Sequence, residues 1–146
     1  MTPKEWFFFF HHPSRIGNCI RRKDSWLAIL GHVQAACYNE DLTWMFIDPA
    51  GARTKVWLTH HFDEVEALLD FRIAHARATY RIAPLEGGIS FPALRPHNNC
   101  VTICASFLGL RAYTPRGLER MLVAHGAEKV DAEAEVRGRR GRQESP

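Results

Sequence analysis

Three side chains in this sequence could together carry out nucleophilic chemistry: Cys100, His32 and Asp48. Cys100 stands where a polar, proline-containing loop changes into an apolar run with helical spacing, and either Asn98 or Asn99 could cap that helix. A thiol in the first turn of a helix faces unpaired backbone N–H groups and the positive end of the helix dipole, which both favour the thiolate. Cys100 is therefore a candidate nucleophile. The alternative is a small buried core residue, because free cysteines are often buried.

The residues around His32 and Asp48 predict a β-hairpin. Residues 25–38 read as one long strand, residues 39–41 are turn formers, and residues 42–48 read as a second strand. A three-residue loop would place His32 directly opposite Asp48, with their Cβ atoms about 4.5–5.5 Å apart. Both faces of the second strand are apolar, so a slip of one residue would separate the pair.

Each member of this constellation has a chemical role in a cysteine hydrolase. The imidazole of His32 would take the thiol proton and pass it to the leaving group, Asp48 would hold the imidazole tautomer, and Cys100 would attack a carbonyl carbon. Taken singly, His32 also fits a core histidine and Asp48 a turn former. The three together favour a thiol-based site. The candidates for oxyanion donors or substrate-lining residues are His97, Asn98, Asn99 and Trp44.

The remaining sequence predicts an α+β fold that would position these residues. Residues 1–126 are expected to form one domain and residues 127–146 a charged, disordered tail. The other predicted elements are strands over 5–12, 54–58 and 78–83, a helix over 63–74 with Asp63 as its cap, a long loop over 84–96, and a helix beginning at Thr114-Pro115.

Composition sets limits on the class of protein. The chain has 146 residues, 46% of them hydrophobic, which suffices for one domain with its own core. A net charge of +3 predicts no specific nucleic-acid partner. The apolar block from Trp6 to Phe10 is too short for a signal peptide or a membrane span, so we expect synthesis in the cytoplasm. The four cysteines form no CxxC pair and are expected to be reduced thiols.

A metal site is the competing chemical interpretation. His97, Cys100 and Cys104 could approach one another across one helix turn. Their spacing matches no strong zinc pattern, and Cys104 falls on the apolar face that a core residue should occupy. The sequence therefore predicts neither a metal nor another cofactor.

The order of these residues resembles that of the circularly permuted papain-like proteins. The strand containing Gly31-His32-Val33 and the segment Trp44-Met-Phe-Ile-Asp48-Pro49 precede Asn98-Asn99-Cys100-Val101. Ordinary papain-like enzymes have the cysteine first, whereas the permuted relatives of NlpC-type peptidases and the lecithin:retinol acyltransferase-like enzymes have the histidine first. The resemblance covers roughly residues 25–125.

This resemblance implies a papain-like fold, in which the cysteine begins a helix packed on an antiparallel sheet. It implies that Cys100 is the nucleophile, His32 the base and Asp48 the orienting residue. Members of this group act on amide bonds in peptidoglycan, on lipid esters or by acyl transfer, and the substrate we expect is a peptide or a peptidoglycan-like amide. The residues from Cys100 to Pro115 are also similar to small phage-encoded proteins. The alternative is therefore a non-catalytic phage-particle or interaction protein on the same scaffold, incorporated into a virion, with Trp6–Phe10 docking on other structural proteins.

Overall fold

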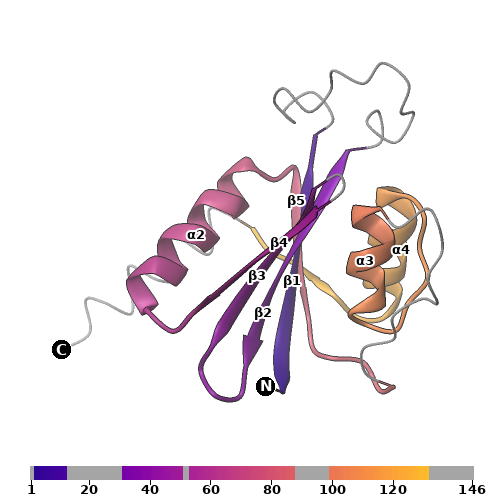
Figure 1. The fold of residues 1–146 in the computed structure, drawn as a ribbon. Helices are drawn as coiled ribbons and strands as arrows, with labels where there is room; N and C mark the ends of the chain where they lie inside the picture. Colours follow the sequence, from indigo (N-terminus) through magenta and orange to yellow (C-terminus); the bar gives the residue numbers. More distant parts are fainter. Residues whose placement is uncertain (1, 13–30, 51–52, 88–98, 132–146) are drawn as a thin grey trace.

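A computed structural model describes residues 2–12, 31–50, 53–87 and 99–131, which form one antiparallel sheet with helices on both faces (Figure 1). The strand order in the sheet is β4-β3-β2-β1-β5-β6. This arrangement confirms the predicted α+β class. The elements are β1 (Pro3–His11), β2 (His32–Asn39), β3 (Trp44–Ala50), β4 (Arg53–Thr59), α2 (Phe62–His75), β5 (Ala78–Ile82), α3 (Cys100–Ser106), α4 (Pro115–Ala124) and β6 (Glu128–Lys129).

The aromatic strand β1 lies inside the sheet between β2 and β5 and is buried on both faces. Because side chains alternate along a strand, Trp6, Phe8 and Phe10 pack in the cluster below α3 and α4. Phe7 and Phe9 pack on the α2 side. The predicted strand is confirmed, and side chains on both of its faces are buried. Its alternative role in docking on a partner is wrong, because these side chains form the core of the domain.

Helix α2 covers one face of the sheet through Val65, Leu69 and Ile73 (Figure 1). The predicted cap at Asp63 is wrong. The helix begins one residue earlier, its N-cap is His61, and no side-chain hydrogen bond closes it. Asp63 instead lies in the first turn, where its negative charge complements the helix dipole.

Helices α3 and α4 cover the opposite face (Figure 1). The rings of Trp6 and Phe107 stack in parallel with their centroids 4.9 Å apart, which ties the end of α3 to β1. Glu119 ties α4 to β5, because it accepts a hydrogen bond from Tyr80 Oη at 2.7 Å and pairs with Arg77. The predicted start of α4 is confirmed, with Pro115 at its first position and Thr114 as its cap.

The β2–β3 hairpin is present, but its register differs from the prediction. Tyr38 pairs with Trp44, and Ala35 pairs with Ile47. The turn includes two more residues than expected, since Asn39 N–H bonds to Thr43 O at 3.0 Å. Every partner is therefore displaced by two residues, an even number that leaves each side chain on its predicted face.

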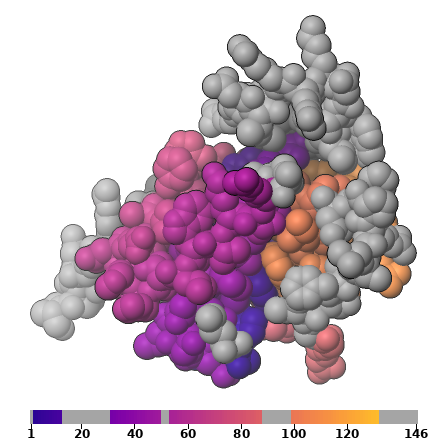
Figure 2. Space-filling view, in the orientation of Figure 1, coloured from indigo at the N-terminus to yellow at the C-terminus, as the bar shows by residue number. Residues whose placement is uncertain are grey.

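The sheet edges differ in exposure. Strand β4 is an edge strand, and Val56, Trp57 and Leu58 on it are exposed. Figure 2 shows the purple strand segments forming surface beside the orange helices. At the other edge, Glu128 and Lys129 pair with β5, although the sequence assigns them to the charged tail. Residues 132–146 of that tail lie outside the described residues.

Two other sequence predictions concern segments that the structure describes only in part. Residues 25–30 of the predicted first hairpin strand and residues 88–96 of the predicted loop lie outside the described ranges. Among the described helices, none has the length and apolar character needed to cross a bilayer.

Replacing Phe8 with alanine should lower the free energy of unfolding by about 3–5 kcal/mol, because it empties a fully buried aromatic site in β1. The matched control is Phe71→Ala at an exposed position of α2, which should change the free energy by about 0.5 kcal/mol or less. Urea unfolding of both variants measures the difference. Equal losses in the two variants would contradict the assignment of β1 as the core strand.

Candidate catalytic site

His32 and Asp48 meet at the end of the sheet where β2 begins and β3 approaches its last residues. His32 Nε2 lies 2.7 Å from Asp48 Oδ1, and both side chains are largely buried, with 17% and 19% of their surface exposed. The observed register sets the two residues diagonally rather than directly opposite each other. The side chains still meet, because diagonal neighbours on one face lie within reach of long side chains.

Cys100 begins helix α3, as the sequence predicts. Asn99 caps the helix by accepting a hydrogen bond from Thr102 N–H at 2.9 Å, and Thr102 Oγ1 in turn accepts one from Asn99 N–H at 2.9 Å. This reciprocal capping box fixes the first turn of the helix. Cys100 is half-buried, and its side chain interacts with His32. The structure thus joins His32 to Asp48 by a hydrogen bond, and Cys100 lies close enough to His32 to raise the pKa of the ring.

The electrostatics of the site favour a protonated His32. Burial of the ring lowers its pKa, but hydrogen bonds with Asp48 and Cys100 and the charges of both groups outweigh burial and raise the pKa to about 9. The pKa of Asp48 is lowered, chiefly by its hydrogen bond with His32. An imidazolium in this position would stabilise a neighbouring thiolate.

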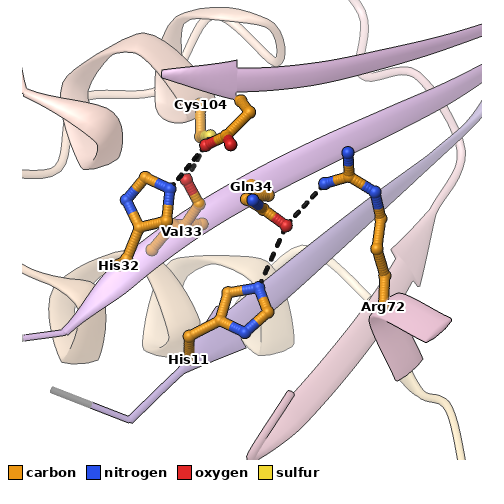
Figure 3. A network of polar contacts seen from close by, with 7 residues as sticks. His11, His32, Val33, Gln34, Arg72 and Cys104 are labelled. Atoms are coloured by element: carbon orange, nitrogen blue, oxygen red, sulfur yellow. Dashed lines mark hydrogen bonds and ion pairs between the residues drawn. The ribbon is translucent and has the colours of Figure 1, made fainter. Parts of the chain in front are cut away.

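A second set of polar residues, His11, Gln34 and Arg72, lies beside His32 (Figure 3). Sequence reasoning missed these residues. Gln34 Oε1 accepts hydrogen bonds from Arg72 Nη1 and from His11 Nε2, the latter at 3.1 Å. Gln34 also helps to lower the pKa of the Asp48 carboxyl. The rings of His11 and His32 stack with their centroids 6.2 Å apart. The polar contacts therefore extend from β2 and β3 to β1 and α2.

Residues of the site contact both helical layers of the domain, α2 on one face of the sheet and α3 on the other. Strands β2 and β3 pair as far as Ala35 and Ile47. Beyond that pair, Gln34 contacts Arg72 on the α2 side of the sheet, while His32 interacts with Cys100 on the α3 side. The end of the hairpin thus joins the two helical layers through polar side chains.

The sequence did contain signals for the missed residues. Gln34 lies two positions before Ala36, which packs on the α2 side, so strand alternation places Gln34 on that face. Arg72 falls at helical spacing from Val65 and Leu69, on the buried face of α2. A cation on that face requires partners, because burying an unpaired charge is unfavourable.

The other residues proposed from the sequence are placed as follows. Trp44 starts β3 at the end remote from Asp48 and packs against Phe7 and Phe46, so the structure does not bring it to Cys100. The Asn99 side chain is engaged as the cap of α3. His97 and Asn98 lie outside the described residues.

The other described thiols differ from Cys100. Burial raises the pKa of Cys37 to about 12 and places that of Cys104 well above its ordinary value. Cys104 Sγ faces Val33 O at 3.8 Å inside the core. Within the described ranges, no group of three or more His, Cys, Asp or Glu residues could hold a metal ion.

Comparison of the chain with family models, with curated proteins and with solved structures found no match. The papain-like permutation and the hydrolase activity therefore stay predictions from the sequence. The site geometry stands on the structure alone.

The Asp48→Asn variant should lower the pKa of His32 from about 9 by about 1–3 units, because it removes the carboxylate that stabilises the imidazolium. Histidine Cε1–H chemical shifts followed by NMR across pH 5–10 give the midpoint, with Glu119→Gln as a control that removes a carboxylate remote from His32. A midpoint near 6.5 in the unmodified protein would contradict the described contacts.

The same raised pKa makes stability depend on pH. The folded state holds the His32 proton more tightly than the unfolded chain does, so its stabilisation is complete below the ordinary value of 6.5 and is lost as the pH rises to about 9. The free energy of unfolding of the unmodified protein relative to His32→Gln should therefore decrease between these two pH values. Urea titrations at pH 6 and pH 9.5 measure that difference, and an increase would contradict it.

Proposed function

We propose that this protein is a thiol-dependent hydrolase that cleaves amide bonds, with Cys100 as nucleophile, His32 as base and Asp48 as the residue that orients His32. One observation carries the proposal: the largely buried His32 ring bonds to Asp48 at 2.7 Å, and the thiol at the start of α3 is close enough to raise the pKa of that ring. A cysteine at a helix start beside an imidazole, which a carboxylate orients in turn, is the arrangement that nucleophilic catalysis requires.

The ring nitrogens of His32 have separate tasks in this mechanism. Nε2 donates a hydrogen bond to Asp48 Oδ1, so Nδ1 is the nitrogen left to take the proton of Cys100. The thiolate then attacks the carbonyl carbon, and the amide nitrogen leaves with the proton that the imidazolium returns. This step forms a thioester. Water activated by His32 cleaves the thioester, which releases the acid and regenerates the thiol.

The start of α3 supplies an oxyanion donor. Cys100 is the first residue of the helix, so its backbone N–H has no acceptor within the helix. Such a fixed donor stabilises the charge that develops on the carbonyl oxygen during attack. The capping box of Asn99 and Thr102 holds this turn rigid.

The substrate class that we propose is a peptide or a peptidoglycan-like amide. Support comes from the sequence resemblance to permuted NlpC-type peptidases and from the Cys–His–Asp geometry described above. Peptidoglycan fragments are therefore the first compounds to assay, followed by simple peptide amides and esters.

The second candidate function is a non-catalytic interaction protein, such as a phage-particle component, on the same scaffold. The exposed apolar side chains of edge strand β4, Val56, Trp57 and Leu58, favour it, because exposed apolar residues on an unpaired strand edge are typical of contact surfaces. In this case Cys100 would be a silent thiol.

Alkylation with iodoacetamide separates the two functions. If Cys100 is an activated nucleophile, its labelling should reach half of its maximal rate well below the ordinary thiol pKa of about 8.5. The His32→Ala variant should move that midpoint upward, and it should abolish hydrolysis of peptidoglycan fragments, as should Cys100→Ser. Mass spectrometry assigns the label to each cysteine, and buried Cys37 and Cys104 serve as internal controls in the same sample.

The opposite outcome has an equally definite meaning. If Cys100 reacts only when urea unfolds the chain, or if His32→Ala leaves the labelling midpoint where it was, the hydrolase proposal fails. The interaction protein then becomes the preferred function.

A further inference from the structure

Edge strand β4 is long enough and apolar enough to pair with another strand. Strand β6, at the other edge of the sheet, has only two residues, and both are charged. Strand β4 has seven residues, and the first six of them are exposed. An edge strand offers backbone N–H and C=O groups to a further strand, and apolar side chains along it favour such pairing. The exposed apolar residues of β4 are consecutive: Val56, Trp57 and Leu58.

The charges along this edge have opposite signs at its two ends. Arg53 and Lys55 lie at the start of β4, and Asp63 and Glu64 lie in the first turn of α2, shortly after its end. Thr59, the last residue of β4, donates a hydrogen bond to Glu64 Oε2 at 2.6 Å, which holds that carboxylate beside the strand. Antiparallel pairing places the start of each strand beside the end of the other. A second copy of β4 therefore complements both ends of this edge.

One register of pairing satisfies the apolar residues and the charges together. When two copies of β4 pair antiparallel about Trp57, that residue faces its counterpart, and Val56 of each copy faces Leu58 of the other. This is the register in which all three apolar residues face one another. Lys55 of each copy then faces Thr59 of the other, and facing residues have adjoining side chains on the same side of the sheet.

Lys55 and Glu64 lie on the same side of the sheet, as this contact requires. Trp57 pairs with Phe46, which packs on the α2 side. Lys55 and Thr59 are each two positions from Trp57, so strand alternation places both on that side. Glu64 belongs to α2 and accepts the hydrogen bond of Thr59 there. In the paired strands the Lys55 ammonium of one copy thus meets the Glu64 carboxylate of the other.

Lys55 is available for this contact. It is exposed and lies across from Asp48 on β3, but Asp48 pairs with His32 instead. None of the ion pairs in the described part of the chain includes Lys55. A lysine on an edge strand ordinarily hinders pairing with another strand. A second copy removes that obstacle, because it supplies a carboxylate at the right position.

We propose that this protein forms a two-fold symmetric dimer, in which the β4 strands of two copies pair antiparallel about Trp57 and Lys55 of each copy pairs with Glu64 of the other. The two sheets join into one, and both α2 helices lie on the same side of it. Every contact occurs twice, because a two-fold interface uses the same surface of both copies. The inference is independent of the hydrolase function, since no interface residue takes part in that mechanism.

Sedimentation equilibrium of the full chain measures the dimer. One strand per copy makes a small interface, so the mass should rise from 16.7 kDa toward twice that value as the concentration approaches about 200 μM. Val56→Lys should raise the dissociation constant at least about tenfold, because it sets a lysine against Leu58 of the second copy. The matched control is Val123→Lys on α4. Val56 and Val123 are both 54% exposed, but only Val56 lies on β4, so the control should dimerise normally.

An exchange of charges tests the register. Lys55→Glu and Glu64→Lys each place like charges together twice in the dimer, so each variant alone should dissociate at least about tenfold more readily. An equimolar mixture of the two variants should dimerise about as well as the unmodified protein, because positions 55 and 64 again carry opposite charges at both contacts. Urea unfolding of each variant verifies that it is folded.

A dimer that Val56→Lys weakens and the mixture of charge variants restores supports the inference. A monomer at the highest concentration overturns it, and the β4 edge is then left for a strand of a different protein. A dimer that Val56→Lys does not weaken also overturns it, because the contact then lies elsewhere. Failure of the mixture to dimerise, with both variants folded, overturns the pairing of Lys55 with Glu64 and the register that depends on it.

Discussion

The ion pair between His32 and Asp48 is the interaction on which the rest of the site depends. Both side chains are largely buried, and a buried charged group is tolerated only when it is paired and hydrogen-bonded. In addition, Cys100 of α3 helps to raise the pKa of His32, and Gln34 of β2, which binds Arg72 of α2, helps to lower the pKa of Asp48. A polar path therefore crosses the sheet at the end of the hairpin, from the thiol of α3 to the guanidinium of α2.

The position of this path follows from the packing of the sheet. Strand β1 is a continuous aromatic core strand, and its rings fix the helices on both faces. Trp6 stacks on Phe107 at the end of α3, and Phe9 lies under the guanidinium of Arg72. A site whose side chains project from strands and helix starts is held more rigidly than one on loops. These two contacts hold α3, which begins with Cys100, and α2, which carries Arg72, against β1.

The described thiols differ in burial and in the groups that surround them. Cys37 and Cys104 are enclosed by apolar side chains, which raises the pKa of each. Cys100 is half-buried and adjoins an imidazole whose protonated form is favoured. Cys104 follows Cys100 by four positions along the chain. The two residues differ because one begins the helix beside His32 and the other faces the core.

The sequence by itself determined the local features: the buried strand of phenylalanines, the cap and proline that start α4, the hairpin, and the cysteine at a helix start. These depend on side-chain periodicity and on the conformational preferences of single residues. Only the tertiary structure decided the hairpin register, because Leu42 adopts a positive φ of 64° and the turn is longer than its composition indicates. It also decided the hydrogen bond between Arg72 and Gln34, since a contact between a helix and a strand 38 positions apart leaves no local pattern in the sequence. The pairing of His32 with Asp48 survived the change of register because a shift of two residues keeps every side chain on the same face of the sheet.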